Sequence, residues 1–443
     1  MATLPVRLDR DASTPLGHQL SDRVRALIQD GSLTRGVRLP SSRALAADLG
    51  VSRSVTEQAY EQLVAEGWLE TRRGAGTYVA SDAAPGAAPA RARVAPEAPA
   101  LVRLDTGTPW IDPRHRAGWR RAWREVSAAA PPRGYDDPRG LLALRVALAE
   151  RLTRTRGVAC GPDEVLITGG TADGLRHLLE ALPPGPIALE DPGYRAALET
   201  VRASHRDVVD VAATHAPVSL TGLAAAYVTP AHQHPLGHVM PSRERLALLA
   251  AAHAADAVVI EDYYDSEFRY DVAPVPALAS LDRDRVAYLG TAAKSVAPSL
   301  RLGWLVAPPT LHESICRRRA LRHDGVAWPV QRAFVALLRD GYVDAVVRSA
   351  RRVYAERAPR VAAVLGPHAA PAGPSAGMYS TWLLPHDRAV AAQAAARRVG
   401  FEVNLLADYC RTSQLTGLVV GFGGVSDTEL DQALTALRRA LEG

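Results

Sequence analysis

Apolar and polar positions in the first eighty residues follow the period of short helices. Between residues 17 and 31, apolar side chains recur at spacings of four, three and one, which indicates an amphipathic helix. Residues 39–70 predict two further helices around a tight turn at Gly50, and residues 69–80 predict a β-hairpin with glycines at its tip. A helix, a helix–turn–helix and a hairpin in this order predict a winged helix, an α+β domain.

The pattern changes after about residue 102, where short apolar runs alternate with helical stretches such as 173–182 and 242–255. The runs are EVLIT (164–168), PIALE (186–190), AAYVTP (225–230), AVVIED (257–262), RVAYLG (285–290) and LGWLVAP (302–308). Strands that alternate with helices predict an α/β fold, with a mostly parallel sheet covered on both faces. From about Leu311 the chain is mainly helical until a late strand, GLVVGF, and a last helix, which predicts a smaller C-terminal α+β lobe.

An Ala/Pro-rich stretch separates the two patterns. The sequence SDAAPGAAPARARVAPEAPA, residues 81–100, has no apolar periodicity and is typical of an extended, semi-rigid linker. We therefore predict a multidomain chain, with a winged helix over residues 1–80, a linker over 81–102 and an α/β domain over 103–443. The smaller lobe of that domain is expected from about residue 311.

Composition narrows the class of protein only modestly. A chain of 443 residues with 47% hydrophobic residues has material for two or three cores, and its net charge of +5 is weak evidence for a nucleic-acid partner. Cys160, Cys316 and Cys410 are isolated and have no metal-ligand spacing. No apolar run reaches the ~18 residues of a membrane span, and the N-terminus lacks a signal-peptide core. We expect a cytoplasmic protein with no metal site and no membrane partner.

Charge placement in the predicted winged helix indicates DNA binding more clearly than the total charge does. Residues 1–79 carry 10 Arg and 9 Asp or Glu, but residues 31–56 carry four arginines and one acid, Asp48. Ser41 or Ser42 can cap the first helix of the helix–turn–helix. Cations at the start of the recognition helix and on the wing can meet the phosphates and a groove of double-stranded DNA. The alternative is a winged helix that contacts only protein. The candidate DNA contacts are Arg43, Ser52 (which can also cap the second helix), Arg53, Arg72, Arg73 and Gly76.

Lys294 is the only lysine in a chain with 52 Lys and Arg residues. Arginine replaces lysine well as a surface charge, but a guanidinium stays protonated and cannot attack a carbonyl. A lysine kept at one position is therefore a candidate Schiff-base former, with pyridoxal 5'-phosphate (PLP) as the cofactor. The alternative is a leftover surface lysine, and the residues around it must decide.

Neighbouring motifs match what PLP needs besides an amine, starting with a cradle for its phosphate. Thr291 and Arg301 lie close to the lysine in sequence and are suited to bind phosphate. The stretch ITGGTADGL, residues 167–175, follows a predicted strand and opens a predicted helix. The backbone amides of its Gly-Gly-Thr turn, residues 169–171, can therefore face the same phosphate.

PLP also needs a carboxylate beside its ring nitrogen and a flat group against its ring. VVIEDYYDSEFRY, residues 258–270, places Asp262 at a strand end, where the sites of α/β proteins lie. Tyr264 can bond the ring hydroxyl, and Tyr194 in EDPGY can stack on the ring. Each residue also has an ordinary structural alternative, but complementary pieces in this order favour a PLP site.

Long motifs in both parts of the chain resemble those of a known family. Residues 39–79, LPSSRALAADLGVSRSVTEQAYEQLVAEGWLETRRGAGTYV, resemble the GntR-type winged helix throughout. GYDDPRG (134–140), VTPAHQHPLG (228–237), IEDYYDSEFRY (260–270) and GTAAKSVAPSLRLGWLV (290–306) are similar to motifs of fold-type I aminotransferases, and more closely of the MocR subfamily of GntR regulators. Over nearly its whole length the chain is therefore identified as a member of that subfamily, in which a linker joins a winged helix to an aminotransferase-like domain.

The resemblance implies roles for individual residues. It implies that Lys294 forms the aldimine with PLP, that Arg43 and Arg53 contact DNA, and that Arg73 and Gly76 form the wing tip. It also implies a homodimer with the active site at its interface, where Tyr135 reaches the phosphate of the neighbouring subunit. The expected cofactor contacts are Tyr135, Gly170, Thr171, Ala172, Tyr194, His234, Asp262, Tyr264, Thr291, Lys294 and Arg301.

Departures from the family pattern cluster at the cofactor site. They are Gly169, Ala172, Asp173, His234, Leu236, Tyr263 and Ala293, and in the winged helix Glu57 stands where a second arginine is common. They bear on cofactor affinity, effector identity and base preference rather than on the fold. Arg195 and Arg411 are candidates for holding a substrate carboxylate, and His232 and His234 are expected to be polar lining rather than acid–base catalysts.

The leading hypothesis for function is a PLP-dependent, DNA-binding transcriptional regulator. It would sense PLP or a small amino compound through an aldimine at Lys294, which shifts its dimer between two arrangements. One alternative is a working aminotransferase with an accessory DNA-binding arm. Another is a regulator whose PLP site has decayed.

Overall fold

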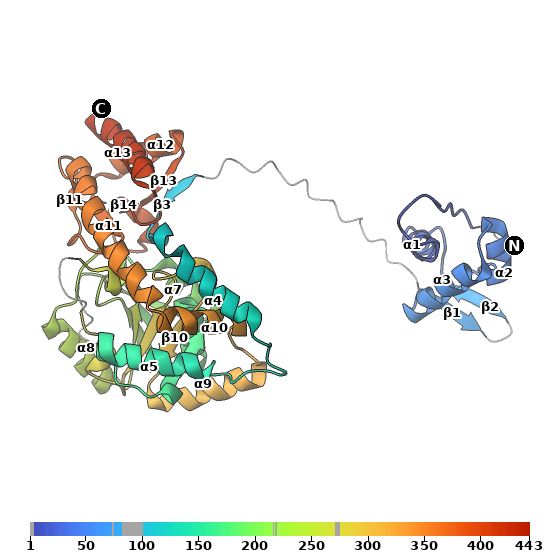
Figure 1. Ribbon diagram of the computed structural model, residues 1–443, viewed down its shortest axis with the longest axis horizontal. Coiled ribbons are helices and arrows are strands. Elements are labelled where there is room, and N and C mark those ends of the chain that lie inside the picture. Colours follow the sequence, from blue (N-terminus) through green and yellow to red (C-terminus); the bar gives the residue numbers. More distant parts are fainter. Residues whose placement is uncertain (1–3, 73–74, 82–100, 216, 218, 271–274) are drawn as a thin grey trace. The chain divides into compact units, whose positions relative to one another are not determined.

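The chain folds as two compact units, Met1–Ala98 and Pro99–Gly443. We describe them from a computed structural model, which covers residues 4–72, 75–81, 101–215, 217, 219–270 and 275–443 (Figure 1). Arg73 and most of the expected linker, residues 82–100, lie outside the described residues.

The first unit is a winged helix. Its elements are α1 (Leu16–Gln29), α2 (Ser42–Leu49), α3 (Arg53–Ala65), β1 (Leu69–Arg72) and β2 (Gly76–Val79) (Figure 1). The two strands pair antiparallel. Leu20, Leu45 and Leu63 come from the three helices and are fully buried, so the predicted apolar spacing does form one core.

The caps of the helix–turn–helix differ from each other. The Ser41 hydroxyl accepts a hydrogen bond from the backbone N–H of Ala44 at 3.2 Å, so Ser41 rather than Ser42 caps α2. The turn at Gly50 has φ +63°, which glycine adopts without strain. The expected cap by Ser52 is wrong, because its hydroxyl is hydrogen-bonded to that of Ser54 at 2.8 Å and makes no bond to the helix amides.

The second unit is built on a seven-stranded sheet. In sheet order the strands are β4 (Val165–Thr168), β10 (Gly303–Val306), β9 (Val286–Thr291), β8 (Val258–Tyr263), β7 (Ala225–Val228), β5 (Ile187–Asp191) and β6 (Val208–Ala212). β10 runs antiparallel to both neighbours, and the other pairs are parallel. The prediction of a mostly parallel sheet is confirmed, although the apolar runs miss β6, a partly exposed edge strand.

Helices cover both faces of this sheet. They are α4 (Arg116–Ala128), α5 (Leu142–Arg156), α6 (Thr171–Ala181), α7 (Arg195–Ala203), α8 (Ser242–Ala255), α9 (Pro309–Arg322), α10 (Trp328–Arg339) and the start of α11 (Tyr342–Leu365). Alternate residues of a strand enter opposite cores: Val165 and Ile167 of β4 pack with α5, α8 and α10, whereas Leu166 packs with α6, α7 and α9.

A smaller α+β lobe completes the second unit. Its sheet has the order β11 (Ala370–Pro371), β12 (Tyr379–Leu383), β14 (Gly417–Gly421), β13 (Phe401–Leu405) and β3 (Val102–Leu104), and α12 (His386–Arg398) and α13 (Asp427–Glu442) pack on it. This lobe does not begin near residue 311. Because α9 and α10 pack on the large sheet, the change of core falls inside α11, between Val346 and Ala350. β3 precedes all the strands of the large sheet in the chain, but it belongs to the small lobe because it pairs parallel with β13.

The described residues contain no helix with the length and apolar character that crossing a membrane requires.

Tyr354 of α11 fixes the chain where it leaves β3. Its buried hydroxyl accepts a hydrogen bond from the backbone N–H of Trp110 at 2.8 Å. We expect Tyr354→Phe to lower the free energy of unfolding of this unit by about 1–3 kcal/mol, because it leaves the N–H without an acceptor. Chemical denaturation measures this. Tyr342→Phe is the matched control, since Tyr342 is another buried tyrosine of α11 and its hydroxyl makes no hydrogen bond to a described residue. An equal loss in both variants would contradict the assignment.

Candidate functional site

The winged helix presents arginines at the start of its recognition helix. Arg43 on α2 and Arg53 at the first position of α3 are both exposed, and so is Ser52. Arg53 is paired with Glu57 one turn along α3, at 2.8 Å, with both side chains well exposed. An exposed pair of this kind is weak, so a DNA phosphate can compete for the guanidinium. Glu57 therefore pairs with Arg53 only weakly.

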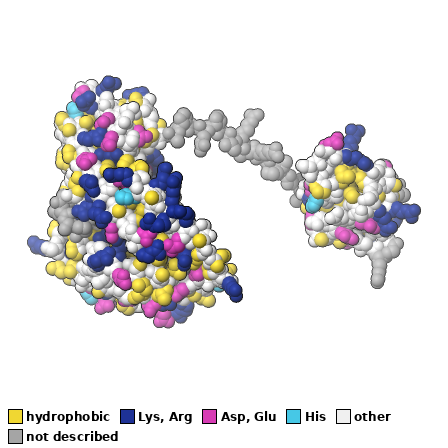
Figure 2. Space-filling model, viewed as in Figure 1, with side chains coloured by type: hydrophobic (Ala, Val, Ile, Leu, Met, Phe, Trp, Pro, Cys, Tyr) yellow, Lys and Arg dark blue, Asp and Glu magenta, His cyan; other side chains and the backbone are white. Residues whose placement is uncertain are grey.

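The wing carries a second cationic group. Arg72 is paired with Glu70 at 2.6 Å and lies over the Tyr78 ring, 4.6 Å from its centroid. Gly76 has φ +114°, and a Cβ there would lie 3.0 Å from Nε of Arg38, so this position requires glycine. Lys and Arg side chains are dark blue in Figure 2. On the winged helix they are all arginine, because the only lysine, Lys294, belongs to the second unit and lines a cavity there.

A cavity of ≈ 340 Å³ in the second unit opens at the carboxyl ends of the parallel strands. Ten of the eleven expected cofactor contacts line it: Gly170, Thr171, Ala172, Tyr194, His234, Asp262, Tyr264, Thr291, Lys294 and Arg301. They lie at the carboxyl ends of β4, β5, β7, β8 and β9 or in the segments that follow these strands. The shared strand ends therefore bring residues more than 130 positions apart into one site.

Lys294 lies in the turn after β9 and directs its amine into the cavity. Its Nζ donates a hydrogen bond to the backbone oxygen of Gly107 at 2.8 Å. Burial lowers the pKa of this amine, and the carboxylates of Asp265, Asp105 and Asp262 partly oppose that shift. A lowered pKa means a larger neutral fraction at neutral pH, which is the form that attacks a carbonyl.

Asp262 at the end of β8 is a buried carboxylate with an unused acceptor. Tyr227 donates its hydroxyl hydrogen bond to Oδ2, but the buried Oδ1 has no hydrogen-bond partner among the described residues. Burial raises the pKa of Asp262 to about 7, against the lowering effects of Tyr227, Lys294 and the nearby Thr171 hydroxyl. A donor that carries positive charge would satisfy Oδ1 and favour the ionised carboxylate.

The start of α6 provides a place where an anion can bind. Gly170 precedes α6 with φ +113°, and the Arg301 guanidinium lies 3.6–3.8 Å from the place a Cβ of Gly170 would occupy. Gly303 of β10 also packs here, since its Cβ would lie 2.8 Å from Cα of Gly170. Thr291 Oγ1 accepts the Ala293 N–H at 3.0 Å, which shapes the turn that holds Lys294. A helix N-terminus beside a guanidinium is suited to phosphate.

Aromatic rings form the remaining wall. The His234 ring is edge-on to both Tyr194 and Tyr264, with centroids 5.5 and 5.6 Å away. Burial, followed by the charge of Lys294, lowers the pKa of His234 to about 3, so the ring is neutral at neutral pH. His234 therefore lines the cavity as an uncharged polar group.

His232, in contrast, does not line the cavity. Its Nδ1 is bonded to the buried Asp265 carboxylate at 2.8 Å. The Tyr264 hydroxyl lies 2.7 Å from that of Tyr379 on β12, so this network joins the cavity wall to the small lobe. Asp265 lies inside the motif IEDYYDSEFRY, but no motif in the sequence pointed to Tyr379, because its contact with Tyr264 forms only when the two lobes pack.

Residues 105–108 form a part of the cavity that the sequence did not reveal. Asp105, Thr106, Gly107 and Thr108 line it, directly after β3. They arrive there because β3 pairs with β13, more than 290 residues later in the chain. That pairing leaves no local signal in the sequence.

Besides His232, three more expected residues lie away from this cavity. Tyr135 is 84% exposed and its ring stacks on His323, with centroids 4.3 Å apart. Arg411 is paired with Asp210 at 2.5 Å, and Arg195 is exposed, above the Tyr409 ring at 5.9 Å. Tyr135 is the residue for which the family resemblance implies a contact in the neighbouring subunit.

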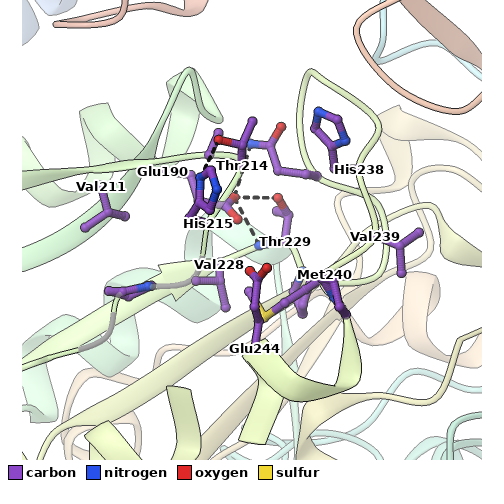
Figure 3. Close-up of a pocket in the computed structure, with 15 residues that line it drawn as sticks. Glu190, Val211, Thr214, His215, Val228, Thr229, His238, Val239, Met240 and Glu244 are labelled. Atoms are coloured by element: carbon purple, nitrogen blue, oxygen red, sulfur yellow. Dashed lines mark hydrogen bonds between the residues drawn. The ribbon is translucent and has the colours of Figure 1, made fainter. Parts of the chain in front are cut away.

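A second, smaller hollow of ≈ 30 Å³ lies beyond Glu190, beside Thr214, His215 and Met240 (Figure 3). Glu190 accepts hydrogen bonds from the backbone N–H and the hydroxyl of Thr229, and burial raises its pKa to about 7. This space suits water rather than a cofactor. No group of three or more His, Cys, Asp or Glu side chains in the described ranges is placed to hold a metal ion.

Both units match known protein families. Residues 16–79 match the family described as bacterial regulatory proteins of the gntR family, and residues 112–437 match aminotransferase class I and II. The chain is 33% identical to the HTH-type pyridoxine biosynthesis transcriptional regulator PdxR of Corynebacterium glutamicum, covering 100% of this chain and 99% of that one. It is 32% identical to the probable rhizopine catabolism regulatory protein MocR of Rhizobium meliloti, over 98% and 95%.

Solved structures show the fold of the second unit. An archaeal alanine:glyoxylate aminotransferase matches with a TM-score of 0.70 and 23% identity, over 77% of this chain and 91% of that one. The α-aminoadipate aminotransferase LysN of Thermus thermophilus matches with a TM-score of 0.66 and 22% identity, over 77% and 92%. Identities this low establish only the fold, which is that of the fold-type I aminotransferases.

Because Lys294 is the only lysine, the pKa of its amine can be measured directly. Reductive methylation of the folded protein, mapped by mass spectrometry, should modify Lys294 with a midpoint below the ordinary lysine pKa of 10.5, because burial favours the neutral amine. In the unfolded chain the midpoint should return to the ordinary value. A folded-state midpoint at or above 10.5 would contradict the derived environment of this amine.

Proposed function

The chain belongs to the MocR-type branch of the GntR transcriptional regulators, and we propose that its response to the cell is set by PLP held in the cavity around Lys294. The single observation that carries this proposal is Asp262 Oδ1, a buried acceptor without a partner in the described part of the cavity wall. The ring nitrogen of PLP, when protonated, is a donor of the kind that this oxygen lacks.

The other cavity residues fit the same cofactor. The cradle of Gly170, the start of α6 and Arg301 suits its phosphate, and the ring of Tyr194 provides a flat surface. Lys294 provides an amine whose pKa burial has lowered. When bound, PLP supplies an aldehyde that condenses with amines and a ring that withdraws electrons. The altered positions Gly169 and Ala172 do not remove any of these groups.

Asp173 keeps the cradle in shape. Its Oδ2 accepts the backbone N–H of Gly169 at 2.8 Å, and Oδ1 is paired with Arg176 at 2.7 Å. These contacts balance the charge of the carboxylate and tie it to the turn before α6. An acidic residue in the first turn is therefore compatible with a phosphate nearby.

Regulation requires that the ligand distinguish two arrangements of the protein. We propose a homodimer, with Tyr135 of each subunit directed to the phosphate of the other, which accounts for a tyrosine that is 84% exposed in one chain. Tyr264 and Tyr379 connect the cavity to the small lobe through their hydroxyls. A ligand that binds one dimer arrangement more tightly shifts the population towards it and so repositions the winged helices on the operator.

A working aminotransferase is the second candidate function, because the fold alone supports it. That activity on amino acids requires a cation for the substrate carboxylate. Neither Arg195 nor Arg411 lines the cavity, and Arg411 is held by Asp210. The site therefore favours sensing over transamination of amino acids.

Replacing the lysine tests the cofactor part of this proposal. We expect Lys294→Arg to lose the visible absorbance of bound PLP and the effect of PLP on DNA binding, because a guanidinium cannot condense with an aldehyde. DNA binding without PLP should remain, since the winged helix is a separate compact unit. Spectra and electrophoretic mobility shifts with and without PLP measure both. An unchanged spectrum in the variant would sink the assignment of Lys294.

Replacing Arg43 tests the DNA part. Arg43→Gln should weaken operator binding and reduce the slope of log K against log salt by about 1, as expected for the loss of one phosphate contact. Arg398→Gln on α12 removes the same charge from an exposed site in the other unit and should change neither value. Fluorescence anisotropy at several salt concentrations measures the slope. Equal slopes for Arg43→Gln and the unaltered protein would remove Arg43 from the interface.

A further inference from the structure

The charges around the cavity bear on which amino compound can enter it. Among the described residues that line the cavity, the cationic side chains are Lys294 and Arg301. The guanidinium of Arg301 lies beside Gly170, which precedes α6, in the cradle proposed for the PLP phosphate. With Lys294 assigned to the aldehyde, no cation of the described lining is left for a carboxylate on the effector.

The two arginines nearest to this role are held elsewhere. Arg411 is fixed by Asp210 at 2.5 Å, and its Nη2 donates to the backbone oxygens of Leu189 and Glu190 at 3.2 and 2.9 Å. Arg195 is exposed and lies over the ring of Tyr409, 5.9 Å from its centroid. An effector carboxylate would have to break the Arg411 contacts or draw Arg195 inward.

His234 does not replace them. Its ring is fully buried and neutral at neutral pH, because burial lowers its pKa to about 3. A carboxylate placed beside it would be desolvated without a counter-charge, which is costly in a buried site.

Anionic and acceptor groups, in contrast, lie beside the amine. Asp105 lines the cavity with a side chain that is 13% exposed, and its Oδ1 accepts the backbone N–H groups of Gly107 and Thr108 at 2.8 Å each. A Cβ on Gly107 would lie 3.3 Å from this oxygen and 3.8 Å from Lys294 Nζ, so the carboxylate and the amine flank the same residue.

The second oxygen of Asp105 is only weakly engaged. Oδ2 lies 3.3 Å from Nε of Arg103, whose side chain is 69% exposed. A pair with so exposed a partner contributes little, and a ligand cation inside the cavity can replace it. The carboxylate of Asp105 is therefore available to a positive group that enters beside Lys294.

We propose that the effector is an aliphatic diamine: one amine is directed to Lys294 and PLP, and the second, as an ammonium, pairs with Asp105. This rests on the proposed function, since it requires PLP in the cavity. Amino acids and ω-amino acids are disfavoured, because their carboxylate would face Asp105 and find no cation in the described lining.

Three ligands that share a four-carbon chain and one reacting amine separate the possibilities. They are 1,4-diaminobutane, butylamine and 4-aminobutanoate, which end in a positive, a neutral and a negative group. Each is titrated into the full-length PLP-loaded protein, and binding is followed by calorimetry and by the change in visible absorbance. We expect the diamine to bind on the order of tenfold more tightly than butylamine, and 4-aminobutanoate to bind most weakly.

Asp105→Asn supplies the matched variant, because an amide oxygen can still accept the two backbone N–H groups while the charge is removed. It should lower the affinity for the diamine to that for butylamine and leave butylamine unaffected. Asp387→Asn, which removes an exposed charge on α12 outside the cavity, should preserve the ranking of the three ligands.

Tighter binding of 4-aminobutanoate than of the diamine would overturn the proposal, because it would show that a cation does reach the effector. An unchanged diamine preference in Asp105→Asn would overturn the role of Asp105. If the unaltered protein shows no absorbance of bound PLP, the proposed function fails and the diamine assignment fails with it. A PLP band with the wrong ranking rejects the diamine assignment alone.

Discussion

The placement of one buried amine organises the second unit. Lys294 Nζ meets the oxygen of Gly107, and the two residues lie 187 positions apart. This contact requires β9 to place the lysine at the carboxyl edge of the large sheet, and it requires β3, paired with β13 in the small lobe, to place residues 105–108 at the cavity. Burial makes the amine easier to deprotonate and makes the nearby Asp262 harder to ionise. A cofactor that accepts the amine and donates to the carboxylate resolves both effects.

Much of this arrangement could be predicted from the sequence, because local patterns determine it. The helix–turn–helix, six of the seven strands and ten cavity residues follow from periodicity, from strand-end motifs and from the family resemblance. The residues that the sequence missed depend on packing between distant segments. Asp105 and Tyr379 reach the site through the small lobe, and His232 turns away from the cavity because the buried Asp265 holds its ring. The sequence predicts the start of the small lobe near residue 311, which is too early, because helical content does not reveal which sheet a helix covers.

The departures from the family pattern keep the fold and change the chemistry at its edges. Asp173 uses its carboxylate to bind the Gly169 amide, and Glu57 uses its own to hold Arg53. His234 remains neutral inside a ring of tyrosines. The described cavity lining keeps the residues suited to PLP, and Lys294 and Arg301 are its cationic side chains.

The central claim is that occupancy of this cavity controls how the winged helices contact DNA. A footprint of the full-length protein on DNA upstream of its own gene, with and without PLP, tests it most directly. For the unaltered protein we expect protection whose extent or spacing changes when PLP is added. For Lys294→Arg we expect protection that does not change when PLP is added. Protection that is identical with and without PLP would contradict it, because the ligand would then have no differential affinity for the two arrangements of the protein.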